Sequence, residues 1–251
     1  MIRTLLIITG ASLVLCIAAL GGAAALGGRD IARHGGSWTF WDEDGERQTV
    51  RFSRRDQGPL VTRTLAWDGG DRLDIEVNAE VTHAQGEEAS VSVSGPKEQV
   101  EALRIVSGRL TFDQNGERID HVVFGWGDSA PLRITVTAPS VNAFNLSSSG
   151  DLLIRNYDQP SLFVAIDGSG EVDATGRTDA VELDISGSGE ADLSGLLTRD
   201  ADIEISGSGE AIVGPTGAAR IAISGSGDVD LTRRPATLNQ SISGSGDINQ
   251  R

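Results

Sequence analysis

Apolar and polar residues alternate around a short glycine-serine-glycine motif that the second half of the chain repeats. In one clear copy, Leu183 and Ile185 precede the motif and Ala191 and Leu193 follow it, each pair separated by one polar residue. Alternation with a period of two is typical of a half-buried β-strand. Each copy is therefore predicted to hold two short strands joined by a corner at Gly-Ser-Gly.

The copies recur at nearly constant spacing along the chain. Each ends in an acidic residue, and the successive steps between them are 20, 19, 20, 18 and 19 residues: Asp151, Glu171, Glu190, Glu210, Asp228 and Asp247. A fixed period of this length is typical of a solenoid, in which each coil covers the apolar face of the next. Coils stacked in register would place parallel strands about 4.8 Å apart. We predict an all-β fold, a single-stranded parallel β-helix.

The glycines of the motif suit such a corner. Glycine has no Cβ atom, so stacked backbones can approach closely. A glycine-rich phosphate-binding loop is the alternative, but that loop needs a helix after it, and here another strand follows every copy. In the last copy Gln240 replaces Ile221, so the final coil is predicted to be a polar cap.

Residues 67–251 are predicted to form one domain, with repeats from about residue 141. The strands expected before the repeats are 73–77, 89–93, 109–112 and 132–136. A short helical turn is expected within 96–106, and Asn115–Gly116 predicts a hairpin. These strands are expected at the end of the β-helix opposite the last copy, with the first coil beginning at Phe144.

The first 28 residues are an apolar run that follows Arg3. The run is long enough for a single transmembrane anchor, and the small residues around Ala24 also fit a cleaved secretory signal, so both interpretations stay open. In either case an N-terminal hydrophobic helix precedes the β-helix, and the rest of the chain is expected outside the cytoplasm. Residues 29–66 are predicted to be a linker or arm. Cys16, the only cysteine, lies in the apolar run, so the exported part is expected to have no disulfide.

The formal net charge of −15 excludes some partners. Residues 141–251 hold 17 acidic and 7 basic residues, a net charge of −10, so two thirds of the excess lies on the repeats. Such a surface repels nucleic acid and anionic lipid headgroups. No nucleic-acid partner is expected, and only the N-terminal segment is expected to engage a membrane.

No catalytic or metal-binding constellation is visible in the sequence. His34, His83 and His121 lie in different segments without a cysteine or second histidine at ligand spacing, so each is expected at the surface or hydrogen-bonded. No serine stands in the context of a nucleophile elbow. We therefore predict no catalytic residue, no cofactor-binding residue, no metal ligand and no cofactor.

The acidic residues that close the copies are the most informative polar set. In register their carboxylates would lie about 4.8 Å apart, close enough to raise one another's pKa or to bind a hard cation such as calcium. A second column is expected two residues further on: Asp173, Asp192 and Asp230. Calcium-binding β-rolls use a nonapeptide repeat, much shorter than this one, so a solvated face that discourages aggregation is the preferred interpretation.

The order of these features resembles a known bacterial family. Residues 65–73 (LAWDGGDRL) lead into the first strand, residues 139–141 (PSV) lead into the repeats, and Ser-Gly-Ser-Gly-Asp/Glu corners follow. Over residues 65–251 the chain resembles the "putative auto-transporter adhesin, head GIN domain" family. The resemblance implies a right-handed parallel β-helix in an exported or cell-surface protein, and it supplies no catalytic residue.

These observations together predict a non-enzymatic exported envelope protein, an adhesion-like or structural β-helix module. The expected location is the periplasm or the inner membrane, with the cell surface less favoured. The expected partner is an envelope protein or polysaccharide that contacts the flat coil faces, and self-association through the coil ends is a further expectation. The alternative is a carbohydrate-active β-helix enzyme, a polysaccharide lyase or hydrolase. It is less favoured because the arginines of the repeats are scattered and copies of 18–20 residues leave no long loops to wall a sugar cleft.

Overall fold

The structure is a computed structural model that describes residues 37–41, 47–51, 59–112 and 131–250. The described residues fall into two compact units. In the first unit, β1 (Ser37–Trp41) and β2 (Arg47–Arg51) form an antiparallel hairpin. The second unit holds the described residues from 59 onward.

The N-terminal segments are only partly within these ranges. Residues 1–28, where the sequence predicts a signal or anchor, lie outside them. Among the described residues no helix is long and apolar enough to cross a membrane. Residues 29–66, for which the sequence predicts a linker, contain β1, β2 and β3 (Leu60–Leu65). The alternation of threonine with other residues along β3 suits an edge strand, and among the described strands β3 pairs antiparallel with β6 alone (Ser90–Pro96).

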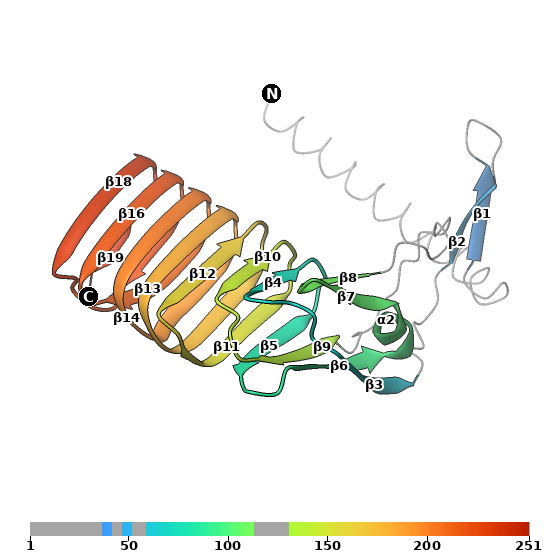
Figure 1. Cartoon of the computed structure of the whole chain (residues 1–251). Coiled ribbons are helices and arrows are strands. Elements are labelled where there is room, and N and C mark those ends of the chain that lie inside the picture. The colour runs from blue at the N-terminus through green and yellow to red at the C-terminus, as the bar shows by residue number, and fades with distance from the viewer. Residues whose placement is uncertain (1–36, 42–46, 52–58, 113–130, 251) are drawn as a thin grey trace, which may run out of the picture. The chain divides into compact units, whose positions relative to one another are not determined.

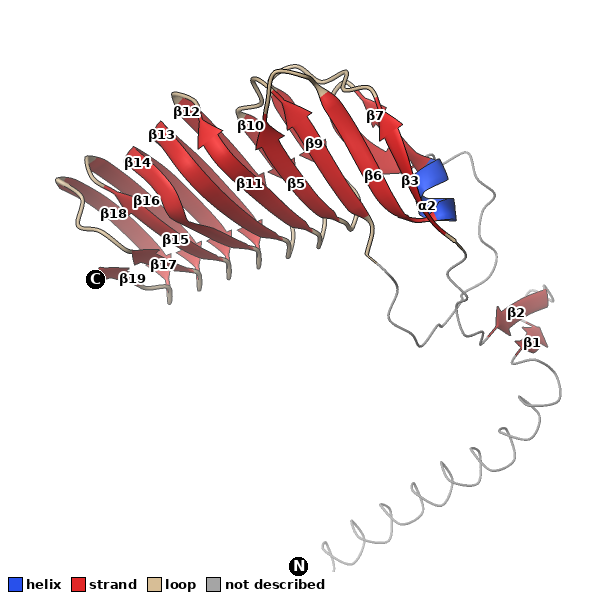
Figure 2. Cartoon of the chain, turned by 90° about the horizontal axis from the view of Figure 1, so that it is seen from below, coloured by secondary structure: helices blue, strands red, loops and turns tan. Residues whose placement is uncertain are grey.

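The second unit is a parallel β-solenoid whose coils contribute strands to two rows (Figure 1, Figure 2). Row A contains, in spatial order, β4 (Arg72–Ile75), β10 (Ala143–Leu146), β12 (Ser161–Ile166), the second half of β13 (Glu171–Gly187), the second half of β14 (Glu190–Gly207), β16 (Ala218–Gly225) and β18 (Thr237–Gly244). Row B contains β5 (Glu80–Gln85), β11 (Asp151–Asp158), the first halves of β13 and β14, β15 (Glu210–Pro215), β17 (Asp228–Leu231) and β19 (Ile248–Gln250). Neighbouring strands within each row pair in parallel, which confirms the predicted β-helix.

The Gly-Ser-Gly corners lie in columns, as the spacing of the copies predicts. Gly187 pairs with Gly207, Gly207 with Gly225, and Gly225 with Gly244. The apolar residues on either side point into the coil, and Ile203 and Ile205 are fully buried. Because each coil is narrow, these aliphatic columns form one continuous core along the stack.

The solenoid begins one coil earlier than the sequence predicts. The expected first coil begins at Phe144, but β4 and β5 already pair in parallel with β10 and β11. Their corner lacks the Gly-Ser-Gly motif, so the motif could not reveal it. Instead the side chain of Asn78 accepts a hydrogen bond from the backbone N–H of Ser149 in the next coil, at 3.1 Å.

A cap of mixed strands closes this end of the stack. β8 (Arg109–Phe112) pairs in parallel with β4, and β9 (Arg133–Ala138) pairs in parallel with β5. β6 and β7 (Leu103–Val106) then add antiparallel to β9 and β8. The short helix α2 (Lys97–Ala102) lies where the sequence predicts a helical turn and buries Val100. The coil of β4 and β5 therefore lies between strands that both follow it in the chain.

A tight hairpin in the cap differs from the predicted one. The predicted hairpin at Asn115–Gly116 lies outside the described residues. The observed hairpin joins β7 to β8 through Ser107 and Gly108, whose φ angles of 51° and 80° are both positive. The carboxylate of Asp68 accepts hydrogen bonds from both backbone N–H groups, at 2.9 and 3.2 Å. Two positive φ angles are typical of the primed turns that fit the twist of paired strands.

The other end of the described stack is the coil of β18 and β19. Gln240 pairs with Ile221, as predicted, and is exposed. Ile242 is 41% exposed at the same end, although its counterparts in earlier coils are buried. This coil thus presents a mixture of polar and apolar side chains.

Candidate functional site

An elongated groove crosses row A near the start of its strands. It has a volume of about 510 Å³ and extends from Asn142, just before β10, to Asn239 in β18. Small side chains line it at the strand starts, Ser161, Ala180 and Ala218, and Asp200 takes the equivalent position between Ala180 and Ala218. Larger side chains two residues further along line it as well: Phe163, Glu182, Asp202 and Arg220. The groove therefore runs along the stack, across the strands.

The register of the coils produces this shape. Ser161 pairs with Ala180, and Phe163 pairs with Glu182, so a column of mostly small side chains, which includes Asp200, stands beside a column of large ones. Each small-column residue lies five positions before the isoleucine that opens the Gly-Ser-Gly copy. This regular position was the signal in the sequence that could have revealed the groove. From the sequence no sugar-sized cleft is expected, because copies of 18–20 residues leave no long loops to wall one. In the structure the walls are side chains of neighbouring strands.

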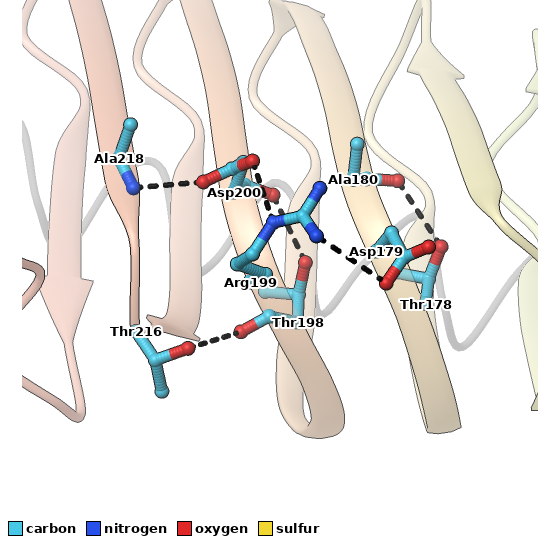
Figure 3. Close-up of polar contacts among 8 residues, drawn as sticks. All are labelled: Thr178, Asp179, Ala180, Thr198, Arg199, Asp200, Thr216 and Ala218. Atoms are coloured by element: carbon cyan, nitrogen blue, oxygen red, sulfur yellow. Dashed lines mark hydrogen bonds and ion pairs between the residues drawn. The ribbon is translucent and has the colours of Figure 1, made fainter.

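A second corner, seen in three successive coils, holds the start of the row A strand in place (Figure 3). The hydroxyl of Thr198 donates to the carbonyl of Asp200 at 2.9 Å, and the hydroxyl of Thr178 donates to the carbonyl of Ala180 at 3.2 Å. Both threonines are buried. In the preceding coil the hydroxyl of Tyr157 donates to the carbonyl of Ser161 in the same way. Each of these bonds gives a hydroxyl a partner within the turn and ties the turn to the start of the next strand.

Asp200 links two coils at this corner (Figure 3). Its Oδ1 accepts a hydrogen bond from the backbone N–H of Ala218 at 2.8 Å, and its Oδ2 accepts one from Nε of Arg199 at 3.0 Å. The Ala218 N–H and, to a lesser degree, Arg199 lower the pKa of Asp200 below its usual range. Arg199 also reaches Asp179 in the previous coil at 3.8 Å. The edge of the groove is therefore held by fixed, charge-assisted contacts.

The groove carries more negative than positive charge. Glu182, Asp200 and Asp202 line it, and Arg220 is the one basic side chain among the described residues that line it. Nη1 of Arg220 lies 3.9 Å from Oδ2 of Asp202, and both side chains are mostly exposed, so this pair is weak. Three of the arginines that looked scattered in the sequence contact acidic neighbours: Arg199, Arg220 and Arg177, which meets Asp158 in two bonds of 2.7 Å.

The predicted acidic column is present on row B. Asp151 pairs with Glu171, Glu171 with Glu190, Glu190 with Glu210, and Glu210 with Asp228, and all five are exposed. The column also continues beyond the copies, because Asp151 pairs with Glu80 and Glu80 forms an ion pair of 2.6 Å with Arg133. Loss of hydration, followed by repulsion from Asp173 and the neighbouring carboxylates, raises the pKa of Glu171.

One expectation about this face changes in the structure. The second column is not continuous, because Ile212 stands between Asp192 and Asp230 in the register. Within the described ranges, no group of three or more histidine, cysteine, aspartate or glutamate side chains is placed to hold a metal ion. The exposed carboxylates form a single-file ladder along the sheet, a different arrangement from the several oxygen ligands that surround calcium.

His83 contradicts the expectation of a surface or hydrogen-bonded histidine. It lies in β5 between Ile154 and Val136, is fully buried, and neither ring nitrogen has a hydrogen-bond partner. Its ring meets Phe144 edge-on, with 5.0 Å between the ring centroids. Burial lowers the pKa of His83 to about 4, and the nearby Ala138 carbonyl, outside good hydrogen-bond geometry, offsets this slightly. His34 and His121 lie outside the described residues.

The fold and the groove define a β-solenoid protein with an open groove on one row of strands. A family model described as "Putative auto-transporter adhesin, head GIN domain" matches residues 71–235, and the chain belongs to this family. The adhesin-like character of the family indicates an extracellular or envelope protein. No curated protein matches the chain.

Solved structures of low sequence identity share the fold. A putative adhesin from Bacteroides fragilis is 19% identical with a TM-score of 0.60, and the match covers 77% of this chain and 97% of that one. A putative adhesin from Parabacteroides merdae is 16% identical with a TM-score of 0.51, covering 80% and 99%. A putative lipid binding protein from Parabacteroides distasonis is 18% identical with a TM-score of 0.50, also covering 80% and 99%. At this identity the likeness establishes the fold and nothing finer.

Proposed function

We propose that this protein is a non-enzymatic binding module of the bacterial cell envelope that makes adhesion-like contacts through the row A groove. The observation that carries the proposal is the groove itself, an open channel built from side chains on a rigid parallel sheet. Membership in an adhesin-like family supports the same role. The apolar N-terminal run supports export, with retention in the periplasm or at the inner membrane.

The open carboxylates of the groove support binding rather than catalysis. A catalytic carboxylic acid needs an environment that raises its pKa, usually burial in an apolar pocket. Glu182 is exposed, and the Asp202 side chain keeps 56% of its surface accessible. The proposed role therefore assigns these side chains to ligand contact.

Capture of envelope material tests this proposal. The full chain would be immobilised and exposed to envelope fragments from the bacterium that produces it. Ala218→Trp fills the groove, whereas Ala222→Trp makes the same change further along β16, also on its outward side but outside the groove. We expect Ala218→Trp to abolish capture and Ala222→Trp to leave it unchanged. Equal capture by both variants would overturn the proposal.

A carbohydrate-active enzyme is the second candidate, favoured by one observation. Glu182, Asp202 and Arg220 line the same groove, and clustered acidic and basic residues are what a polysaccharide lyase or hydrolase requires. The test is release of new reducing ends or unsaturated products from polysaccharides incubated with the full chain. Release that Glu182→Gln and Asp202→Asn both abolish would establish the enzyme and replace the binding module.

A further inference from the structure

We infer that the ligand of the row A groove is a neutral, linear polysaccharide, held by side chains along the stack of coils. This inference rests on the proposed function and specifies the chemical class of its ligand. Four features of the groove lead to it: the use of its backbone groups, its side-chain chemistry, its length and openness, and its charge.

The backbone groups of the groove floor are already used within the solenoid. The strands beneath the groove from β12 through β16 pair in parallel on both sides, and β18 at the end of the row pairs in parallel with β16. At the strand starts, the N–H of Ala180 donates to Pro160 at 3.1 Å and the N–H of Ala218 donates to Asp200 at 2.8 Å. An extended peptide binds a sheet by pairing with a free strand edge, and this surface is the face of the sheet. The ligand must therefore be recognised by side chains.

The side chains present suit a ligand rich in hydroxyl groups. Asn142 and Asn239 offer both amide donors and acceptors at the two ends of the groove, and the carboxylates of Glu182 and Asp202 accept hydrogen bonds between them. Phe163 is half-buried in the wall and presents an aromatic surface to the groove. Planar polar groups beside an aromatic ring can bind the hydroxyls and the apolar face of a sugar ring together.

The length and openness of the groove favour a chain. From β12 to β18 the groove crosses four strand spacings, which is about 19 Å at about 4.8 Å each. A lipid tail would instead need an enclosed apolar cavity, and the inward positions of these coils are filled by buried aliphatic side chains such as Val181 and Ile221. A linear polymer of several units fits along the outside of the coils.

The charge of the groove selects against acidic chains. Three carboxylates line it against the single guanidinium of Arg220, and the whole protein carries a net charge of −15. Anionic polysaccharides would be repelled at close range. Asp200 and Asp202 each already contact an arginine, so no strong demand for a cationic ligand remains at those positions. A neutral polysaccharide is not repelled by the carboxylates and brings no cationic group, so it fits the charge of the groove.

Affinity electrophoresis tests the inference directly. The full chain, in a polyoxyethylene detergent, would run in native gels containing dextran, laminarin, galactomannan or hydroxyethyl cellulose as neutral probes and alginate as the acidic probe. We expect at least one neutral polysaccharide to slow the protein, and Ala218→Trp to weaken that binding about tenfold or more. Ala222→Trp should bind as the wild type does. Thermal melts of both variants would show that each is folded.

The outcomes separate this inference from the proposed function. Slowing by none of the neutral polysaccharides, stronger slowing by alginate, or equal slowing of both tryptophan variants would overturn the polysaccharide inference. If Ala218→Trp still abolishes capture of envelope fragments in any of these cases, the binding module stands with a different ligand. Loss of capture after protease treatment of the fragments would identify a protein ligand and overturn the inference as well.

Discussion

The repeating coils and the cap form their contacts in different ways. In the coils from β12 to β19, each strand pairs with strands about one repeat away in the sequence, and the same corners recur. Where the cap meets the first coil, β4 pairs with β8 of the cap on one side and with β10 on the other, and both follow it in the chain. The coils are a nearest-neighbour structure, whereas the cap depends on contacts between distant segments.

This difference shows where each region is sensitive to change. In the coils, one altered corner disturbs the same position in the coils above and below, because the backbones stack directly. In the cap, antiparallel strands and α2 cover the core where the repeats would otherwise end. The following predictions compare the two regions, from the largest expected effect to the smallest.

The largest effect is expected at a strained corner of the coils. Gly207 has a φ of 137°, and a Cβ atom there would lie 2.3 Å from the carbonyl oxygen of Gly187. Gly207→Val should therefore lower the free energy of unfolding by about 3–5 kcal/mol, from backbone strain together with overpacking. Urea and thermal melts measure the change.

The matched control is the same corner in an earlier coil. Gly168 has no left-handed φ, a Cβ atom there would lie 3.0 Å from the carbonyl oxygen of Ser148, and Ser148 itself occupies the equivalent position one copy earlier. Gly168→Ser should cost about 1 kcal/mol or less. If Gly168→Ser proved as damaging as Gly207→Val, the account of the corner strain would be wrong.

A large effect at low pH is expected where the first coil meets the cap. Burial holds the pKa of His83 at about 4, below its ordinary value of 6.5, so between these pH values the unfolded chain binds a proton that the folded protein does not. Stability should fall by about 1.4 kcal/mol per pH unit as the pH drops through this window, about 3 kcal/mol in all.

His83→Leu isolates this contribution from other titrating groups. The difference in unfolding free energy between variant and wild type should grow in favour of the variant from pH 7 to pH 4. Denaturant melts at several pH values measure it. A difference that stays constant with pH would mean that the pKa of His83 is the same in the folded and the unfolded protein.

A moderate effect is expected at the second corner. Thr198→Val keeps the shape of the side chain but removes the hydroxyl that donates to the carbonyl of Asp200, and the site is buried. The expected loss is about 1 kcal/mol. Thr216→Val removes the hydrogen bond to the carbonyl of Thr198, a longer one of 3.3 Å, from an exposed side chain and should change stability by about 0.5 kcal/mol or less. Thermal melts that reverse this order would exclude the buried threonine as the main stabilising group of the corner.

The smallest effect is expected on the acidic column. The pKa of Glu171 is raised in the folded protein, so its charged form destabilises the fold as pH rises through that pKa. Glu171→Gln should raise stability at pH 7 by about 0.5 kcal/mol or less, because the site is exposed and screened. The gain should disappear at pH 3 and in high salt. Glu88→Gln, in the turn between β5 and β6, serves as the control and should show no such salt dependence.

The repeats were predictable because the residue patterns that define them lie within short stretches of the sequence. The alternation around Ile185 and Ile205 reveals the strands, and the constant spacing of the closing acids reveals the stacking. Even the looser first copy is explained, since Ser148 replaces a glycine where no strained φ occurs, whereas Gly150 remains because a Cβ atom would lie 2.5 Å from the carbonyl oxygen of Ala79. The coil of β4 and β5 was missed because it has no such motif.

The groove was not predictable from any single copy. Ala180 and Ala218 are ordinary exposed residues in their own strands, and they form a channel only because the register places them in one column beside larger side chains. The burial of His83 has a similar origin, since β9 and β11 pair with β5 on its two sides. Both features depend on which strands become neighbours.

By itself, the sequence determined that this chain forms stacked β coils with glycine corners, a continuous aliphatic core and an acidic outer column, because these features follow from a period of two within strands and about 19 residues between copies. Only the tertiary structure decided that β4 and β5 lie between β8–β9 and β10–β11, that His83 is buried, and that a groove crosses row A. The reason is physical: local patterns fix the conformation of a segment, whereas pairing between distant segments is chosen by the packing of the whole unit.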